Sequence, residues 1–200
     1  MLVSIFDKAE ETENPDMFSP QILGGKGYGL WKMQQQGVNV PPALIIPTTV
    51  CVDYMQKPKT VMKSVAAEYS AMAAFFKDKM GYMPLLSVRS GAQVSMPGMM
   101  DTVLNVGLDA STLPYWKKTL GAEACQDSLE RLHTMYGNVV MGLPRKSLEG
   151  KVHTAEDFEA VTGLPMPKAK QQVLGAIEAV FQSWNNDRAK FYRKLNNIPD

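Results

Sequence analysis

Residues 87–102 read SVRSGAQVSMPGMMDT, and this stretch decides the fold because it interrupts an otherwise regular alternation of strand-like and helix-like segments. It follows a hydrophobic run, and Gly91, Pro97 and Gly98 are residues that break helices and strands. Three methionines, an arginine and an aspartate stand among hydroxyl-bearing residues. The stretch therefore predicts a strand that ends near Arg89 and an irregular loop after it.

The chemistry of this stretch suits an anion. Arg89 stands at the end of the predicted strand LLSV, where a guanidinium can hold a phosphate with two parallel hydrogen bonds. The following SMPGMMDT adds the hydroxyls of Ser95 and Thr102 and exposed amides, which can fold over phosphates as a flap. A surface salt bridge is the alternative for Arg89, and the methionines can either wall an adenine pocket or plug the space between two lobes.

A second glycine-bearing segment, GGKG at 24–27, has the ingredients of a phosphate cradle. Its glycines allow close backbone approach, Lys26 carries a compact charge, and a helix follows whose first amides point the same way. The spacing differs from that of a Walker A loop. A glycine-rich turn with a solvated lysine is the alternative.

The patterning along the chain predicts a mixture of short strands and helices, an α/β or α+β fold. Gly37 is expected to end the first helix, and Thr48 or Thr49 to cap the next one. Residues 143–169 are weakly patterned and predict a connector. The predicted strands are 2–6, 44–46, 85–88 and 102–108. The predicted helices are one within 24–37 with the glycines at its entry, one that Thr48 or Thr49 caps and that runs to about Met55, 61–80, a region from 111 or 112, 122–143 with lost regularity near Gly137, and 170–197 with a break at NND.

Composition restricts the class of protein. The net charge is +1, with 21 Lys and Arg against 20 Asp and Glu, so no global field favours nucleic acid or an anionic membrane as a partner. Asp7 and Lys8 interrupt the first apolar run, which predicts neither signal peptide nor anchor. Cys51 and Cys125 are expected to be buried free thiols, in keeping with a reducing cytoplasm.

Four blocks carry a resemblance to a known family: ILGGKGYGLWKMQQQGVNVPPALIIPTTVC, SVRSGAQVSMPGMMDTVLNVGL, MYGNVVMG and GAIEAVFQSWNNDRAKFYRKLNNIPD. In this order they resemble the N-terminal nucleotide-binding region of the pyruvate phosphate dikinase family. The resemblance implies part of an ATP-grasp fold that holds ATP between two lobes, with Mg²⁺ bridging its phosphates. It also implies one ATP-binding domain over residues 1–200, with a helical lobe at about 110–170.

The resemblance assigns roles to particular residues. Lys26 and Arg89 are expected to contact the nucleotide. The loop expected to cover the phosphates consists of Ser95, Met96, Pro97, Gly98, Met99, Met100, Asp101 and Thr102. Carboxylate ligands for Mg²⁺ must converge on the ion, and no family-matched set is found in the chain.

Enzymes of the family are several times longer than 200 residues. They pass a phosphoryl group from ATP to a histidine on a swivelling domain and then to pyruvate, which gives phosphoenolpyruvate. His133 and His153 lack the surroundings of that acceptor; His133 is expected to pack in a helix or face the surface, and His153 to be solvated. The chain is therefore predicted to be inactive alone and to need a second polypeptide with the remaining lobe, or to self-associate. The alternatives are a non-enzymatic nucleotide-binding or enzyme-mimicking module, and a scaffold whose resemblance is only ancestry.

Overall fold

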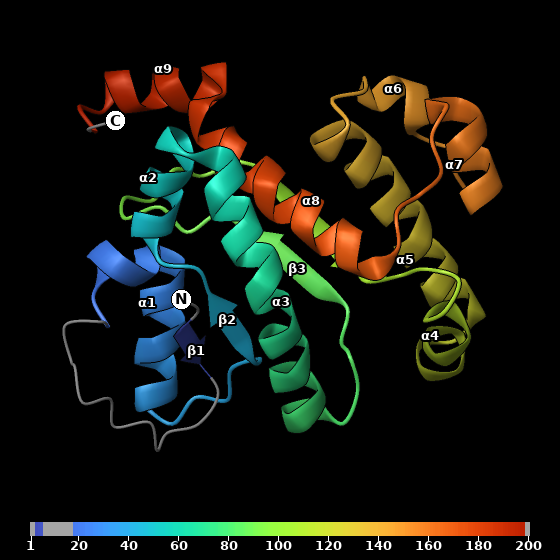
Figure 1. The fold of residues 1–200 in the computed structure, drawn as a ribbon, viewed down its shortest axis with the longest axis horizontal. Coiled ribbons are helices and arrows are strands. Elements are labelled where there is room, and N and C mark those ends of the chain that lie inside the picture. Colours follow the sequence, from blue (N-terminus) through green and yellow to red (C-terminus); the bar gives the residue numbers. More distant parts are fainter. Residues whose placement is uncertain (1–2, 6–17, 199–200) are drawn as a thin grey trace. The chain divides into compact units, whose positions relative to one another are not determined.

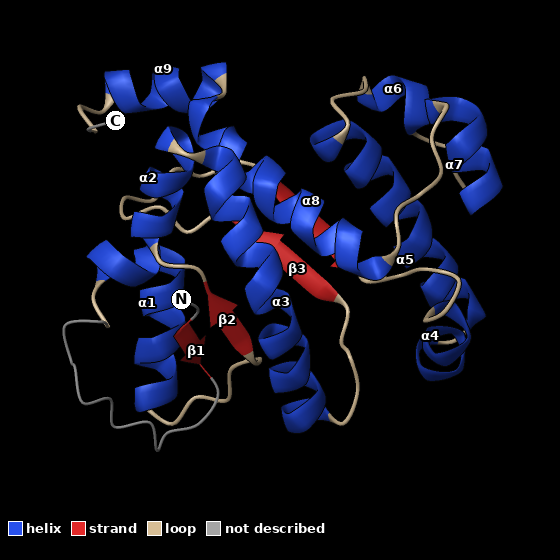
Figure 2. Cartoon of the chain, viewed as in Figure 1, coloured by secondary structure: helices blue, strands red, loops and turns tan. Residues whose placement is uncertain are grey.

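Helices dominate the part of the chain that the structure describes, and the strands occur as two short antiparallel pairs (Figures 1 and 2). The structure is a computed structural model, and it describes residues 3–5 and 18–198. The predicted first strand is found as β1 (Val3–Ile5). Its predicted ends at 2 and 6 lie outside the described residues.

The chain forms two compact units, and each takes its residues from separate stretches of sequence. Unit 1 comprises Met1–Tyr82, Ser90–Met100 and Trp184–Asp200, and unit 2 comprises Met83–Arg89 and Asp101–Ser183. The stretch 87–102 therefore crosses from unit 2 into unit 1 and back. The expectation of one domain with a helical lobe at about 110–170 stays a prediction.

Unit 1 contains one strand pair and most of the longer N-terminal helices. Antiparallel pairing aligns Val3 with Ile45. The elements of unit 1 after β1 are α1 (Pro20–Gln35), β2 (Ala43–Ile45), α2 (Thr48–Gln56), α3 (Pro58–Met80) and α9 (Asp187–Leu195).

The first helix ends as predicted. Gly37 has φ +81°, and its amide donates to the carbonyl of Gln34 at 2.9 Å, while the amide of Val38 donates to the carbonyl of Met33 at 3.0 Å. This pair of bonds is a Schellman motif, which needs a left-handed residue that glycine adopts without strain. The predicted start of the helix is too late, because α1 begins at Pro20 and is interrupted at Gly24.

The predicted cap of the second helix is wrong. The N-cap residue of α2 is Pro47, without a side-chain capping bond. The hydroxyl of Thr48 instead donates to the carbonyl of Gln21, at the start of α1. The Thr48 hydroxyl, which the local pattern assigned to helix capping, therefore bonds to a segment that is distant in sequence.

Aromatic side chains pack the start of unit 1. Phe18 and Leu23 are buried, and Ile22, Tyr28, Trp31 and Ile45 pack against them. The ring centroids of Phe18 and Trp31 are 5.3 Å apart, and those of Tyr28 and Trp31 are 5.6 Å apart. This cluster fixes α1 on the strand pair, because it joins residues of α1 to Ile45 of β2.

Unit 2 is built on the second strand pair. Its elements are β3 (Leu86–Arg89), β4 (Thr102–Val106), α4 (Leu113–Leu120), α5 (Ala122–Met135), a π-helical turn (Tyr136–Val140), α6 (Arg145–Leu148), α7 (Ala155–Thr162) and α8 (Ala169–Gln182). Helix α8 packs against both strands, and α5 packs against β4. The predicted loss of regularity near Gly137 is confirmed by the π-helical turn.

The predicted connector over 143–169 contains two helices that the sequence interpretation missed. The longer one, α7, begins with a capping box: the hydroxyl of Thr154 accepts from the amide of Asp157, whose carboxylate accepts from the amide of Thr154. Its C-terminal residue Gly163 is left-handed, with φ +74°. Both signals are present in the sequence, but the short helix offers only one buried aromatic, Phe158, to the core.

Both cysteines are free, but they differ in exposure. Cys125 is buried, whereas Cys51 is only partly buried, so the expectation of two buried thiols holds for one of them. Burial still raises the pKa of Cys51 to about 11. Across the described residues, no helix combines the length and the apolar character that crossing a membrane requires.

Candidate nucleotide-binding site

The two glycine-bearing segments singled out in the sequence lie against each other within unit 1. The amide of Gly25 donates to the carbonyl of Ala92 at 2.9 Å. Beside it, Nε2 of Gln93 donates to the carbonyl of Gln21 at 3.1 Å. The start of α1 and the first part of the Ser90–Met100 segment are thus joined by hydrogen bonds to main-chain carbonyls.

Gly24 makes this close approach possible. Its φ of 69° and ψ of 165° lie in a region that is open essentially to glycine alone. A Cβ at this position would lie 1.4 Å from the carbonyl oxygen of Gly91. Gly24 therefore allows the backbones of the two segments to pack against each other, in addition to any role toward a ligand.

Lys26 lies just after this interruption. It is exposed and stands in the first turn of the long regular part of α1. Because the helix restarts here, the lysine and the first amides of the restarted helix lie at the same end.

The centre of the predicted flap is a tight turn. The amide of Met99 donates to the carbonyl of Met96 at 3.2 Å, and Gly98 has φ +72°. Proline followed by a left-handed glycine is typical of a type II turn. Ser95 and Pro97 are exposed, a Cβ on Gly98 would meet open space, and Met96 is 5% exposed. The turn thus has an open tip and a packed base.

A residue that the sequence interpretation did not single out holds this turn. Nδ2 of Asn186 donates to the carbonyl of Met99 at 3.0 Å, and Oδ1 of the same side chain accepts from the amide of Ala189 at 2.7 Å. The sequence showed the NND segment only as a break between helices. The available signal was an asparagine directly before a helix, which is a preferred N-cap.

The remaining candidate residues belong to unit 2. The register pairs Arg89, the last residue of β3, with Thr102, the first residue of β4. Arg89 is exposed, as expected of a strand-end arginine. The amide of Asp101 donates to Oγ of Ser183 at 3.1 Å, and Oγ of Ser183 in turn donates to the carbonyl of Val180 at 2.7 Å.

The ten predicted residues thus form two groups, each held by its own unit. The unit 1 group is Lys26, Ser95, Met96, Pro97, Gly98, Met99 and Met100, and the unit 2 group is Arg89, Asp101 and Thr102. The chain itself links the groups after Arg89 and after Met100.

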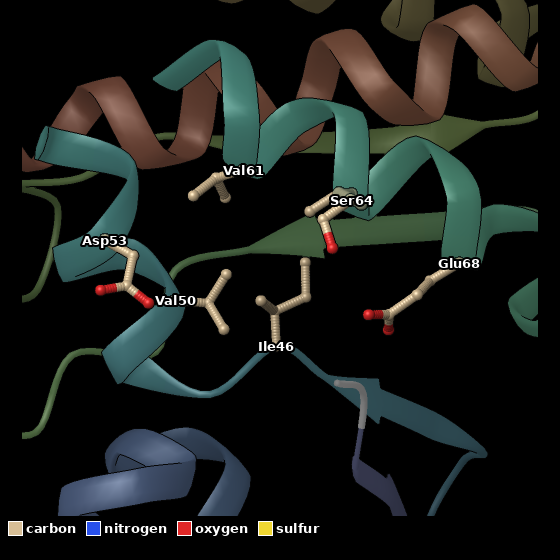
Figure 3. Close-up of a pocket in the computed structure, with 7 residues that line it drawn as sticks. Ile46, Val50, Asp53, Val61, Ser64 and Glu68 are labelled. Atoms are coloured by element: carbon tan, nitrogen blue, oxygen red, sulfur yellow. The ribbon is translucent and has the colours of Figure 1, made fainter. Parts of the chain in front are cut away.

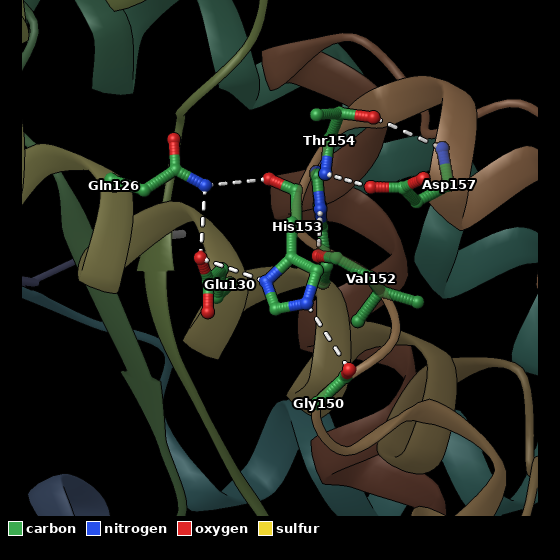
Figure 4. Close-up of polar contacts among 8 residues, drawn as sticks. Gln126, Glu130, Gly150, Val152, His153, Thr154 and Asp157 are labelled. Carbon is green, nitrogen blue, oxygen red and sulfur yellow. Dashed lines mark hydrogen bonds and ion pairs between the residues drawn. The ribbon is translucent and has the colours of Figure 1, made fainter.

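The two histidines lie in unit 2. His133 is buried at 1% exposure, and its Nδ1 donates to the carbonyl of Val152 at 3.0 Å, so its role is packing. His153 is exposed; its Nδ1 lies 3.0 Å from Oε1 of Glu130, and its Nε2 lies 3.1 Å from the carbonyl of Gly150 (Figure 4). Because both partners are acceptors, the protonated ring satisfies both contacts.

These contacts and this burial shift the pKa values of both histidines and of Glu130. Burial lowers the pKa of His133. The hydrogen bond and charge of Glu130 raise the pKa of His153, and the hydrogen bonds from Gln126 and His153 lower the pKa of Glu130.

Within residues 3–5 and 18–198, no group of three or more His, Cys, Asp or Glu side chains is arranged to hold a metal ion.

Unit 1 also contains a small pocket of about 200 Å³ that involves none of the predicted site residues. Figure 3 shows Asp53 and Val50 on one lining helix and Glu68 on another. The lining residues are Ile46, Val50, Asp53, Val61, Ser64, Val65 and Glu68. Its volume is below the usual range for a drug-sized ligand site.

The α+β fold agrees with that of a nucleotide-binding domain of the ATP-grasp type. Residues 55–200 match the model of the pyruvate phosphate dikinase AMP/ATP-binding domain, and the chain belongs to this family. It is the ATP-binding portion of a pyruvate phosphate dikinase-like protein.

Relatives from plants and bacteria agree with this assignment. The chain is 36% identical to the chloroplastic pyruvate, phosphate dikinase of Flaveria bidentis, over 98% of this chain and 24% of the relative. It is 35% identical to the pyruvate, phosphate dikinase of Clostridium symbiosum, over 89% of this chain and 24% of the relative. The chain therefore spans about a quarter of the length of these relatives. The alignment to the Flaveria protein runs over 230 positions, more than the 200 residues of this chain, so that relative carries insertions.

Proposed function

We propose that Lys26, Arg89 and the loop from Ser95 to Thr102 hold the phosphates of ATP. The observation that carries the proposal is the hydrogen bond from Gly25 to Ala92, which joins the GGKG segment to the stretch that leads into the loop. The close approach of Gly24 to Gly91 supports the same pairing of the two segments.

Each group has a distinct role in this proposal. Lys26 supplies a compact positive charge, and Arg89 supplies a planar pair of donors for two phosphate oxygens. The turn at Pro97–Gly98 contributes amides and covers the phosphates, since its tip is open. Thr102 pairs with Arg89 in the β3–β4 register, and Asp101 precedes it in the chain.

We also propose that ATP arrives with Mg²⁺, as in phosphoryl transfer generally. Protein ligands for this ion are usually one or two carboxylates that act together with the phosphates. The described residues offer no cluster of carboxylates at the candidate site, and Asp101 alone does not make one. No chemical step is therefore assigned to a metal held by this chain.

The wider reaction, transfer of phosphate from ATP through a histidine to pyruvate, is proposed for an assembly and not for these 200 residues alone. The chain spans about a quarter of its relatives, and His133 and His153 lack the sequence surroundings of the family's phosphoryl acceptor. We propose a cytoplasmic assembly in which a second polypeptide, or a second copy of the chain, completes the site.

Calorimetric titration with ATP and Mg²⁺ tests the proposal. The wild-type chain should release binding heat. Lys26→Ala and Arg89→Ala should each weaken the affinity about tenfold or more, because a hydrogen bond to a charged group contributes about 1.5–3 kcal/mol. The matched controls are Lys32→Ala in the same helix and Arg131→Ala, an exposed arginine paired with Asp127 in unit 2. Equal losses in the controls and the site variants would refute the assignment.

The alternative, a nucleotide-binding module without phosphoryl transfer, makes the same binding prediction but differs in the next step. The chain can be mixed with a polypeptide that carries the remaining three quarters of a relative, in the presence of ATP labelled on its β-phosphate. Label that reaches the added polypeptide supports the phosphotransferase. Binding heat without any transfer supports the module.

A further inference from the structure

Asn186 uses both ends of its side-chain amide, and they act on two different segments of unit 1. Oδ1 accepts from the amide of Ala189 at 2.7 Å and so caps α9. Nδ2 donates to the carbonyl of Met99 at 3.0 Å. The amide of Ala189 can only donate and the carbonyl of Met99 can only accept, so the two ends of the amide cannot be exchanged.

The chain around Asn186 makes further contacts within unit 1. Arg193 of α9 is 2% exposed, its Cζ lies 4.2 Å from the ring centroid of Trp184, and its guanidinium donates to the carbonyl of Trp184. The neighbouring Asn185 donates from Nδ2 to Sδ of Met55 at 3.1 Å. This bond ties the segment before α9 to α2. Trp184 and Asn185, the two residues before Asn186, are thus held by contacts of their own.

The Met96–Met99 turn combines one internal hydrogen bond with one from outside. The bond from the amide of Met99 to the carbonyl of Met96 closes the turn, and the bond from Asn186 ties it to the start of α9. A Cβ placed on Gly98 would meet no atom within 4 Å, so side-chain packing does not hold the tip from that direction. The bond from Asn186 is thus the contact that ties the Met99 carbonyl to the start of α9.

We infer that Asn186 is a positioning residue, which holds the Met96–Met99 turn in the conformation that covers the nucleotide phosphates. The inference rests on the proposed function of that turn. Asn186 itself need not touch ATP, because it acts through the Met99 carbonyl. A merely structural role in capping α9 would require only the Oδ1 contact, which makes the two roles separable by substitution.

Two substitutions separate them. Asn186→Asp keeps an oxygen for the Ala189 amide but turns an oxygen toward the Met99 carbonyl, so that bond is lost. Asn186→Ser also keeps a capping oxygen and removes the group that reaches Met99. The control is Asn196→Ser at the other end of α9, where Nδ2 donates to the carbonyl of Tyr192 at 2.9 Å and no contact with the turn is involved.

The readouts on the full chain are amide hydrogen exchange, helical circular dichroism and calorimetry with ATP and Mg²⁺. In both Asn186 variants, amide exchange in residues 98–100 should accelerate about three- to tenfold, and ATP should bind about three- to tenfold more weakly, as expected for the loss of one net hydrogen bond. Helicity and the exchange of α9 should stay at wild-type values. Asn196→Ser should leave the turn and the affinity unchanged.

Unchanged exchange in the turn of both Asn186 variants would overturn the inference. So would faster exchange with an unchanged affinity for ATP, because the turn would then be held by Asn186 without any consequence for the nucleotide. If the wild-type chain takes up no ATP, the proposed function fails. The exchange data then decide separately whether Asn186 holds the turn.

Discussion

Gly24 is the described glycine with the least room for a side chain, because a Cβ would lie 1.4 Å from the carbonyl oxygen of Gly91. Its backbone conformation excludes other residues independently of that contact. Two requirements therefore act on one position. The sequence interpretation explained the glycine by close approach to a phosphate, whereas the structure shows close approach to the protein's own backbone.

Gly24→Ala should destabilise the chain by about 3 kcal/mol or more. A residue forced into a glycine-only conformation costs about 1–3 kcal/mol, and displacement of the Gly91 backbone adds to that cost. The measurement is the free energy of unfolding from urea titration, followed by exchange of the Gly25 amide, which should lose its bond to Ala92.

Gly29→Ala is the matched control within the same helix. A Cβ at Gly29 meets no atom within 4 Å, so alanine should stabilise the helix by up to about 1 kcal/mol. If both substitutions have the same effect on unfolding, the contact between Gly24 and Gly91 does not matter for stability.

At the scale of elements, Gln172 joins the start of α8 to the end of β4. It is fully buried, Nε2 donates to the carbonyls of Leu108 and Pro167 at 2.8 Å each, and Oε1 accepts from the amide of Gly107 at 2.9 Å. Asp109 reinforces the same junction by accepting from the amide of Ala169 at 2.9 Å. Burial raises the pKa of Asp109, but the hydrogen bonds from Ser111, Ala169 and Thr112 outweigh it and lower the pKa below its ordinary value.

Gln172→Ala should lower the free energy of unfolding by about 3 kcal/mol. The substitution leaves a buried amide and buried carbonyls without partners, and each such group costs about 1–3 kcal/mol. The adjacent Gln171 is exposed, so Gln171→Ala should change stability by less than about 0.5 kcal/mol. Similar losses from both substitutions, in thermal or urea unfolding, would contradict this role of Gln172.

Long, strongly patterned elements could be predicted from the sequence, and elements fixed by distant contacts could not. Helix α3 and the division of the C-terminal helix at NND are found where the pattern indicated. Helix α7 was missed because its signals are its caps more than an apolar face. The predicted cap at Thr48 was wrong because its hydroxyl bonds to the distant Gln21 carbonyl. In the candidate site, Lys26 and Arg89 stand in recognisable motifs, whereas Asn186 acts on Met99 across a large separation in sequence.

At the scale of the whole molecule, the response of stability to pH adds the effects of two histidines, the only two in the chain. The lowered pKa of buried His133 means that the unfolded chain takes up a proton first as the pH falls below the ordinary value of 6.5, so stability falls there. The raised pKa of His153 has the opposite sign: its contribution is present below 6.5 and is lost as the pH rises through the raised value. Because the His153–Glu130 pair is exposed and screened, the His133 effect should dominate.

The urea midpoint of the wild-type chain should therefore fall between about pH 7 and about pH 5.5, the range around the ordinary pKa of histidine. His133→Asn, which keeps a donor for the Val152 carbonyl, should flatten this decline, while His153→Asn should leave it in place. A decline that persists unchanged in His133→Asn would show that the buried ring does not control the acid response.

The interleaving of the two units has a consequence for synthesis. Unit 1 draws on Met1–Tyr82, Ser90–Met100 and Trp184–Asp200, with the residues of unit 2 inserted between them. On the ribosome, the turn at Pro97–Gly98 is synthesised long before Asn186 and α9, so it lacks the Asn186 bond until those residues have been made. Unit 2 is closed once Ser183 has been made, and it is therefore the first of the two that can complete its fold. The order of translation thus gives the Pro97–Gly98 turn its bond to Asn186 only after the residues of unit 2 have been made.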